Sequence, residues 1–141
     1  MPQRKIGTML SEIPFANLPI LLKKQQFDFF IVDTEHGAFD YSFLSSIAAV
    51  STLSGMDMIV RLSDNGRKDI LKYMDMGIPG LLLPMTNTRE DIATVVRYAK
   101  YSHQGQRGIS TTRLHTLYAP ANLRDMMAEA NRKTKVYAQL E

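Results

Sequence analysis

Short apolar runs alternate with helical patterns along most of the chain. Residues 27–32 are almost continuously apolar, which is expected for a β-strand covered on both faces. Four other short runs also predict strands, at residues 6–10, 58–62, 80–84 and 136–140.

Helical spacing appears between these runs. Residues 92–99 place apolar side chains at positions i, i+3, i+4 and i+7, so they predict one buried helical stripe. Similar patterns predict four more helices, near residues 18–22, 43–50, 70–74 and 123–130. Gly55 and Gly77 follow the second and third of these helices and are suitable stop signals.

This alternation of strand and helix predicts an α/β fold with a parallel sheet and right-handed crossovers. A doubly wound sheet and an eight-stranded barrel both fit the rhythm. Neither GxGxxG nor GxxxxGK[ST] follows any predicted strand, which favours the barrel. A complete TIM (β/α)8 barrel needs about 250 residues, and the chain has 141. We therefore expect residues 1–141 to form a single domain, the N-terminal portion of such a barrel with about five of its eight βα units.

Composition narrows the classes of function. Hydrophobic residues make up 45% and charged residues 22%, the balance of a globular protein. There is no cysteine, so a metal would need oxygen or imidazole ligands. No long apolar run or secretory signal is present, which predicts a cytoplasmic protein without a membrane partner. The net charge is +3, but the basic residues are scattered, so we expect no nucleic-acid partner.

Polar residues gather at the predicted carboxyl ends of the strands. In a barrel these ends face the active site. They carry two carboxylates, an imidazole, a guanidinium, an amide and a further carboxylate, at Asp33, Glu35, His36, Arg61, Gln139 and Glu141. No lysine lies at such an end, since Lys135 begins its strand, and this disfavours Schiff-base chemistry.

Each candidate has a structural alternative. Asp33 could cap the following helix, and Arg61 could be a structural ion-pair partner of Asp33 or Glu35. His36 could be an ordinary loop residue and Glu141 an exposed one. His103 and His115 are expected to face solvent in the 102–116 loop, which could form either an active-site wall or a subunit contact.

Six segments carry a resemblance to a known family. They read GTMLSE (7–12), FDFFIVDTEHGAFD (27–40), IVRL (59–62), DMGIPGLLLPMTNTRED (75–91), VRYAKYSHQGQRGIST (96–111) and QLE (139–141). With these segments in this order, the chain resembles the HpcH/HpaI aldolases, metal-dependent class II pyruvate aldolases on a (β/α)8 barrel.

The resemblance implies a role for each matching residue. His36 matches the catalytic histidine, Asp33 the acid that orients it, and Arg61 the arginine that holds the substrate oxygen. Glu141 matches a carboxylate ligand of a divalent metal (Mg²⁺, Mn²⁺ or Co²⁺), and Gln139 lies beside it in the substrate pocket. The family's second metal carboxylate, in a GPxDLS-type segment, has no counterpart in residues 1–141.

The implied reaction is reversible retro-aldol cleavage of a 4-hydroxy-2-oxo acid to pyruvate and an aldehyde. Oligomers, typically hexamers, are common in the family, so a homo-oligomer is expected. Two alternatives stay open. One is a related carbon–carbon bond enzyme, similar to citrate synthase or an oxaloacetate decarboxylase. The other is an inactive truncated chain that acts only by association.

Overall fold

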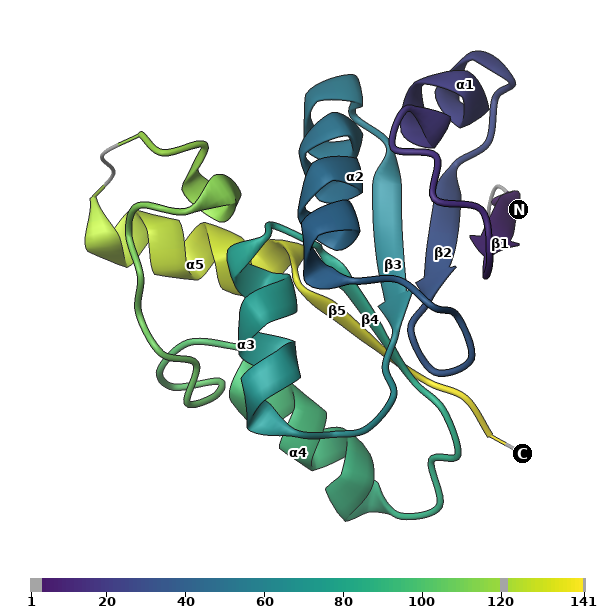
Figure 1. Ribbon diagram of the computed structural model, residues 1–141. Coiled ribbons are helices and arrows are strands. Elements are labelled where there is room, and N and C mark those ends of the chain that lie inside the picture. Colours follow the sequence, from purple (N-terminus) through teal and green to yellow (C-terminus); the bar gives the residue numbers. More distant parts are fainter. Residues whose placement is uncertain (1–3, 120–121, 141) are drawn as a thin grey trace.

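The strands of the chain form one parallel sheet in which sequence neighbours are also neighbours in space (Figure 1). The computed structural model describes residues 4–119 and 122–140. Within these residues the sheet has five strands in the order β1-β2-β3-β4-β5. The strands are β1 (Gly7–Leu10), β2 (Phe29–Asp33), β3 (Asp57–Arg61), β4 (Gly80–Leu83) and β5 (Lys135–Ala138).

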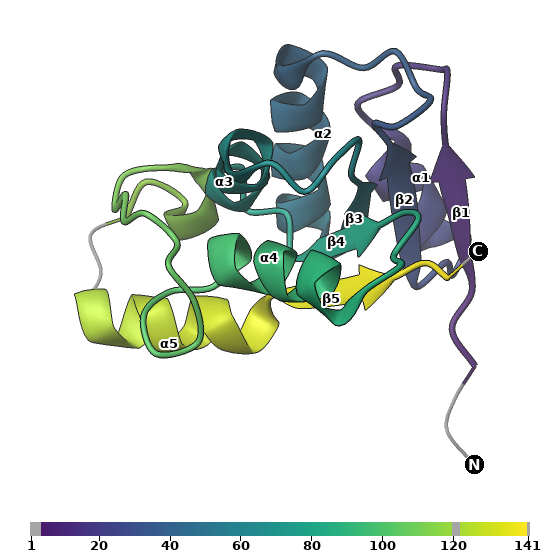
Figure 2. The same ribbon diagram turned by 90° about the horizontal axis from the view of Figure 1, so that it is seen from below.

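Helices connect the strands and cover one face of the sheet (Figures 1 and 2). They are α1 (Leu18–Lys24), α2 (Tyr41–Ser54), α3 (Arg67–Asp75), α4 (Arg89–Ala99), the short 3₁₀ helix η1 (Leu114–Thr116) and α5 (Leu123–Lys133). No described helix has the length and apolar character needed to cross a lipid bilayer.

The strand order distinguishes the predicted barrel from the doubly wound sheet that fits the same alternation of strands and helices. In a doubly wound sheet the order reverses, with later strands on both sides of the first one. Here every crossover moves one strand further in the same direction, and the sheet curves, as in the wall of a barrel (Figure 2). The predicted α/β barrel portion with five strands is confirmed, and the element bounds differ from the predicted ones by a few residues.

The core lies between the sheet and the helices. Phe30, Val32, Met58, Val60 and Leu81 alternate along the middle strands, and each is at most 1% exposed. Burial of such a side chain contributes about 1.5–3 kcal/mol, so these strands have their strongest packing on the helix-covered face.

The other face of the sheet carries a second set of side chains. Strand register pairs Ile31 with Ile59 and Asp33 with Arg61 on this face. Ile31, Ile59 and Arg61 are partly exposed. In a barrel this is the inner face, and its last rung, Asp33 and Arg61, reaches the carboxyl edge of the sheet.

The 102–116 loop packs on the helical layer, away from that edge. Arg107 is its anchor, with a side chain 2% exposed and an ion pair of 3.0 Å to Asp75 at the end of α3. The guanidinium also lies 4.5 Å from the ring centre of Tyr101. The loop belongs to the connection that leads from the end of α4 to the start of β5. Connections from a helix to the next strand lie at the amino edge of a parallel sheet. The active-site-wall alternative is therefore wrong for this loop.

The two loop histidines differ. His103 is exposed, as predicted. The prediction for His115 is wrong, because η1 packs it against the end of α3, and both of its ring nitrogens are buried. Burial lowers the pKa of His115, and the nearby Arg107 charge acts in the same direction.

Candidate active site

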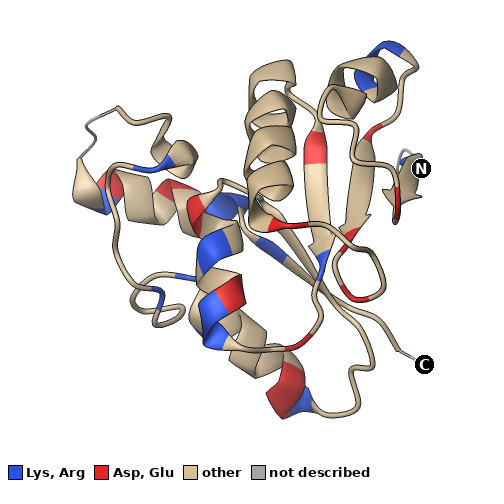
Figure 3. Ribbon diagram, viewed as in Figure 1, with Lys and Arg blue, Asp and Glu red and all other residues tan. Residues whose placement is uncertain are grey.

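Asp33 and Arg61 occupy the last positions of β2 and β3 and face each other in register. Their side chains form a bidentate ion pair, with Arg61 Nε donating to Asp33 Oδ1 at 2.9 Å and Nη2 to Oδ2 at 2.6 Å. The Asp33 side chain is 3% exposed and that of Arg61 is 14% exposed. In Figure 3, acidic and basic positions adjoin at the tips of β2 and β3. A planar guanidinium matched to a carboxylate in this way is held in a defined orientation.

The turn after β2 is held by the same carboxylate. Asp33 Oδ1 accepts hydrogen bonds from the main-chain N–H groups of Glu35 (3.0 Å) and His36 (3.2 Å). Thr34 ties the turn to β3, since its N–H and its hydroxyl both donate to the Arg61 carbonyl oxygen, at 3.1 and 2.6 Å. A Cβ at residue 37 would collide with the main-chain oxygens of Asp33 and Ser11, so the chain needs Gly37 there.

These contacts also set the ionisation of Asp33. The hydrogen bond from Arg61 is the largest influence, and with the two amide donors it holds the pKa of Asp33 below its ordinary value near 3.8. Burial acts in the opposite direction and is outweighed. Asp33 is therefore a carboxylate at neutral pH. The alternative that Asp33 caps the next helix is not what the structure shows, because Asp40 caps α2.

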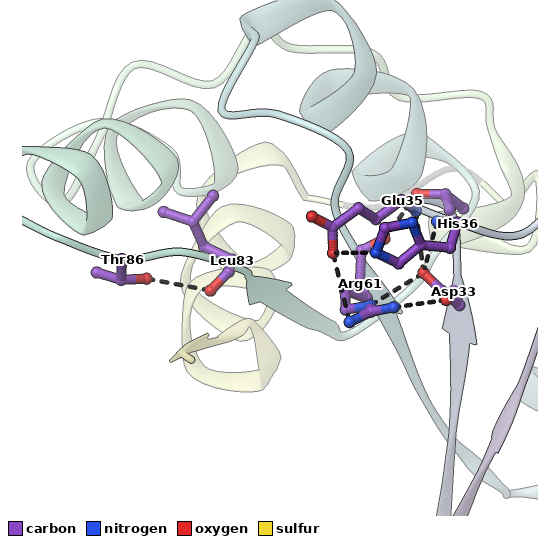
Figure 4. Close-up of polar contacts among 7 residues, drawn as sticks. Asp33, Glu35, His36, Arg61, Leu83 and Thr86 are labelled. Atoms are coloured by element: carbon purple, nitrogen blue, oxygen red, sulfur yellow. Dashed lines mark hydrogen bonds and ion pairs between the residues drawn. The ribbon is translucent and has the colours of Figure 1, made fainter. Parts of the chain in front are cut away.

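Glu35 and His36 complete the cluster on the solvent side (Figure 4). Glu35 Oε2 lies 3.3 Å from Arg61 Nη1 and 3.9 Å from His36 Nε2. The Glu35 side chain is 20% exposed, whereas that of His36 is 75% exposed and reaches the open edge of the sheet. Asp33 contacts the main chain of His36, and the carboxylate that faces its imidazole belongs to Glu35.

The ends of β4 and β5 meet beside this cluster. Gln139 follows β5, and its N–H donates to the Leu83 carbonyl at 2.9 Å. Its own carbonyl accepts from the Thr86 N–H at 3.0 Å, and the Thr86 hydroxyl donates to the Leu83 carbonyl at 3.1 Å (Figure 4). Glu141, the predicted metal ligand, lies outside the described residues.

The structure therefore brings together Asp33, Glu35, His36 and Arg61, and fixes the backbone of Gln139 at the same edge of the sheet. The ion-pair geometry anticipated as an alternative for Arg61 is present, with both acidic residues. Thr34 and Thr86 were not singled out from the sequence. In the sequence, the signal that could have identified them is their position within three residues of the end of a predicted strand.

Residues 4–119 and 122–140 contain no group of three or more His, Asp or Glu side chains arranged to hold an ion. Asp33 and Glu35 direct their oxygens at Arg61. The described residues therefore do not fit a complete metal site.

The chain is similar in sequence to characterised aldolases. Residues 18–141 match the family described as HpcH/HpaI aldolase/citrate lyase. The hydroxypyruvate/pyruvate aldolase of Rhizorhabdus wittichii is 28% identical over 102 residues, which cover 72% of this chain and 41% of that protein. The 4-hydroxy-2-oxovalerate aldolase of Rhodococcus jostii is 32% identical over 88 residues, or 62% of this chain and 34% of that protein.

A solved structure shows the same likeness in three dimensions. An HpcH/HpaI aldolase from Desulfitobacterium hafniense superposes with a TM-score of 0.94 at 27% identity, over 99% of this chain and 53% of that one. The chain thus spans less than half the length of the two curated relatives and about half of the solved structure.

Proposed function

The chain belongs to the HpcH/HpaI aldolase/citrate lyase family, and on that premise we propose that the whole protein is a carbon–carbon lyase. Its reaction is the reversible retro-aldol cleavage of a 4-hydroxy-2-oxo acid to pyruvate and an aldehyde. The observation that carries this proposal is the cluster of Asp33, Glu35, His36 and Arg61 at the carboxyl edge of a parallel barrel sheet.

His36 acts as the general base. It takes the proton of the C4 hydroxyl, the oxygen lone pair forms the aldehyde C=O bond, and the C3–C4 bond breaks. The electron pair of that bond passes to C3 and gives an enolate whose charge lies on the C2 oxygen. Return of that proton from the His36 imidazolium to C3, directly or through water, yields pyruvate and restores the neutral base. The high exposure of the imidazole supports this role, because a substrate can reach it without a rearrangement of the fold.

Arg61 binds the C2 oxygen where the negative charge develops. A guanidinium carries five N–H donors and stays protonated throughout, so one donor can turn to the substrate while others hold the carboxylates. Asp33 keeps the guanidinium oriented through its two hydrogen bonds and holds the main chain of His36. Such a fixed donor stabilises charge without reorganisation during the reaction.

We further propose a divalent metal, Mg²⁺, Mn²⁺ or Co²⁺, with Glu141 as one ligand and Gln139 beside the substrate. A bound metal would supply charge stabilisation for the enolate. We also propose that the whole protein forms a homo-oligomer.

A second candidate is a related carbon–carbon bond enzyme on the same scaffold. The family description itself includes citrate lyase, which favours reactions on citrate-like or oxaloacetate-like acids. The same base and arginine would serve there, since those acids also pass through an enolate stabilised at an oxygen.

The test is pyruvate release by the purified full chain, followed with lactate dehydrogenase and NADH. We expect release from 4-hydroxy-2-oxo acids, loss of release in EDTA, and recovery with Mn²⁺ or Mg²⁺. Undiminished release in EDTA would contradict the metal proposal. Turnover of oxaloacetate without any turnover of 4-hydroxy-2-oxo acids would favour the second candidate, and no turnover of either would favour an inactive chain.

A further inference from the structure

The side chain of Glu35 lies between the two residues to which the proposed reaction assigns chemistry. One of its oxygens, Oε2, faces Arg61 Nη1 at 3.3 Å and His36 Nε2 at 3.9 Å (Figure 4). With 20% of its side chain exposed, Glu35 is partly shielded from water beside Arg61, whereas the imidazole of His36 is 75% exposed and meets the carboxylate at the solvent side of the cluster.

Asp33 makes a different set of contacts. Its two oxygens accept hydrogen bonds from Nε and Nη2 of Arg61. Oδ1 also accepts hydrogen bonds from the main-chain N–H groups of Glu35 and His36. The carboxylate that faces the His36 imidazole is that of Glu35. Asp33 therefore binds the main chain of the turn, and Glu35 faces the imidazole ring of His36.

The charges of the cluster support an active role for Glu35. Arg61 carries one positive charge and faces two carboxylates, so Asp33, Glu35 and Arg61 together are negative by one charge. An N–H group on Nε2 of the imidazole would direct its positive end toward that negative charge.

We propose that Glu35 is a positioning residue that holds the proton of neutral His36 on Nε2 and thereby leaves Nδ1 as the proton-accepting nitrogen. This inference rests on the proposed role of His36 as the base. When Nδ1 takes the substrate hydroxyl proton, Glu35 stabilises the imidazolium and keeps the ring beside Arg61. When Nδ1 returns the proton, the ring becomes neutral again, with its proton still on Nε2.

The opposite arrangement is physically distinct. If Asp33 oriented the ring directly, the proton would lie on Nδ1 and Nε2 would be the base. The two arrangements differ in the tautomer of His36, which imidazole nitrogen chemical shifts report without any need for catalysis.

The experiment measures these shifts in ¹⁵N-labelled full chain above neutral pH, with His36→Gln used to assign the signals among the three histidines. We expect the Nε2–H tautomer of His36 in the unmodified protein and a mixture of tautomers in Glu35→Gln. Glu129→Gln is the matched control. Glu129 also pairs with an arginine (Arg132, 2.7 Å) and a second cation (Lys133, 3.2 Å), but near the end of α5, which leads to the amino edge of the sheet.

A dominant Nδ1–H tautomer of His36 in the unmodified protein would overturn the proposal. This measurement does not depend on the folding of any variant. Identical His36 shifts in folded Glu35→Gln and the unmodified protein would overturn it as well. In turnover assays, kcat of Glu35→Gln should fall about 10–100-fold with little change in KM, and Glu35→Asp should recover part of the loss. If the tautomer is as expected but no 4-hydroxy-2-oxo acid is cleaved, the proposed reaction fails while the placement of Glu35 stands.

Discussion

Asp33 and Arg61 form the last rung of the sheet between β2 and β3, and their side chains close that rung with two hydrogen bonds of 2.9 and 2.6 Å. Both residues lie on the inner face, where a barrel has no helix to cover them. The rung therefore joins the apolar sheet to the polar edge that carries Glu35 and His36. The single carboxylate of Asp33 thus binds both the proposed catalytic Arg61 and the main chain of the turn that carries His36, the proposed base.

Removal of Arg61 should destabilise the protein strongly. Arg61→Met leaves the Asp33 carboxylate buried without its cation, which costs about 3–5 kcal/mol of the free energy of unfolding. Urea denaturation measures this loss. The double variant Asp33→Asn, Arg61→Met should recover much of it, because no buried charge then remains. In the exposed pair of Arg97 and Glu90, Arg97→Met should cost about 0–1 kcal/mol. A similarly small effect at Arg61 would show that the rung contributes little to stability.

Stability should also fall in acid because of Asp33. The pKa of Asp33 is lowered in the folded state, chiefly by Arg61, so its contribution is fully present above the unfolded value near 3.8. The contribution is lost as the pH falls through the lower, folded value. Asp33→Asn lacks this contribution and should show a shallower loss of stability between about pH 5 and pH 3. Parallel curves for the variant and the unmodified protein would exclude Asp33 as the source.

The 102–116 loop should loosen when Asp75 loses its charge. Asp75→Asn leaves the guanidinium of Arg107, 2% exposed, without its carboxylate. We expect a loss of about 3–5 kcal/mol and faster trypsin cleavage within the loop. Limited proteolysis followed by mass spectrometry gives the sites of cleavage. Asp125→Asn is the control, since Asp125 lies in the first turn of α5 and is exposed. Equal rates of trypsin cleavage within the loop in both variants would show that the Arg107–Asp75 ion pair does not anchor the loop.

Much of the fold could be predicted from local sequence. The apolar run that ends at Val32 is a strand as predicted, although only the face that carries Phe30 and Val32 is fully buried and Ile31 on the other face is partly exposed. The predicted stripe in α4 is buried at Val95 and Ala99. Strand ends could be located because polar residues follow apolar ones there. The barrel was predicted over a doubly wound sheet only from the absence of glycine-rich nucleotide-binding motifs and from the family resemblance, because strand order depends on contacts between elements far apart in the sequence.

The details of the site depended on the same long-range geometry. Asp33 and Arg61 are 28 residues apart, and only the register of β2 against β3 makes them partners. Glu35 had no assigned role in the sequence, because its position between Arg61 and His36 follows from the turn that Asp33 caps. His115 was placed wrongly for a related reason, since the packing of η1 on α3 leaves no local signal.

We propose His36 as the base of an aldol cleavage at the carboxyl edge of this sheet. The most direct test compares pyruvate release from a 4-hydroxy-2-oxo acid by the full chain and by His36→Ala, with divalent metal present in both assays. The imidazole is 75% exposed, so the variant should keep its thermal stability, while kcat should fall about 10²–10⁴-fold. Equal rates of pyruvate release from the two proteins would contradict the role of His36 as the base.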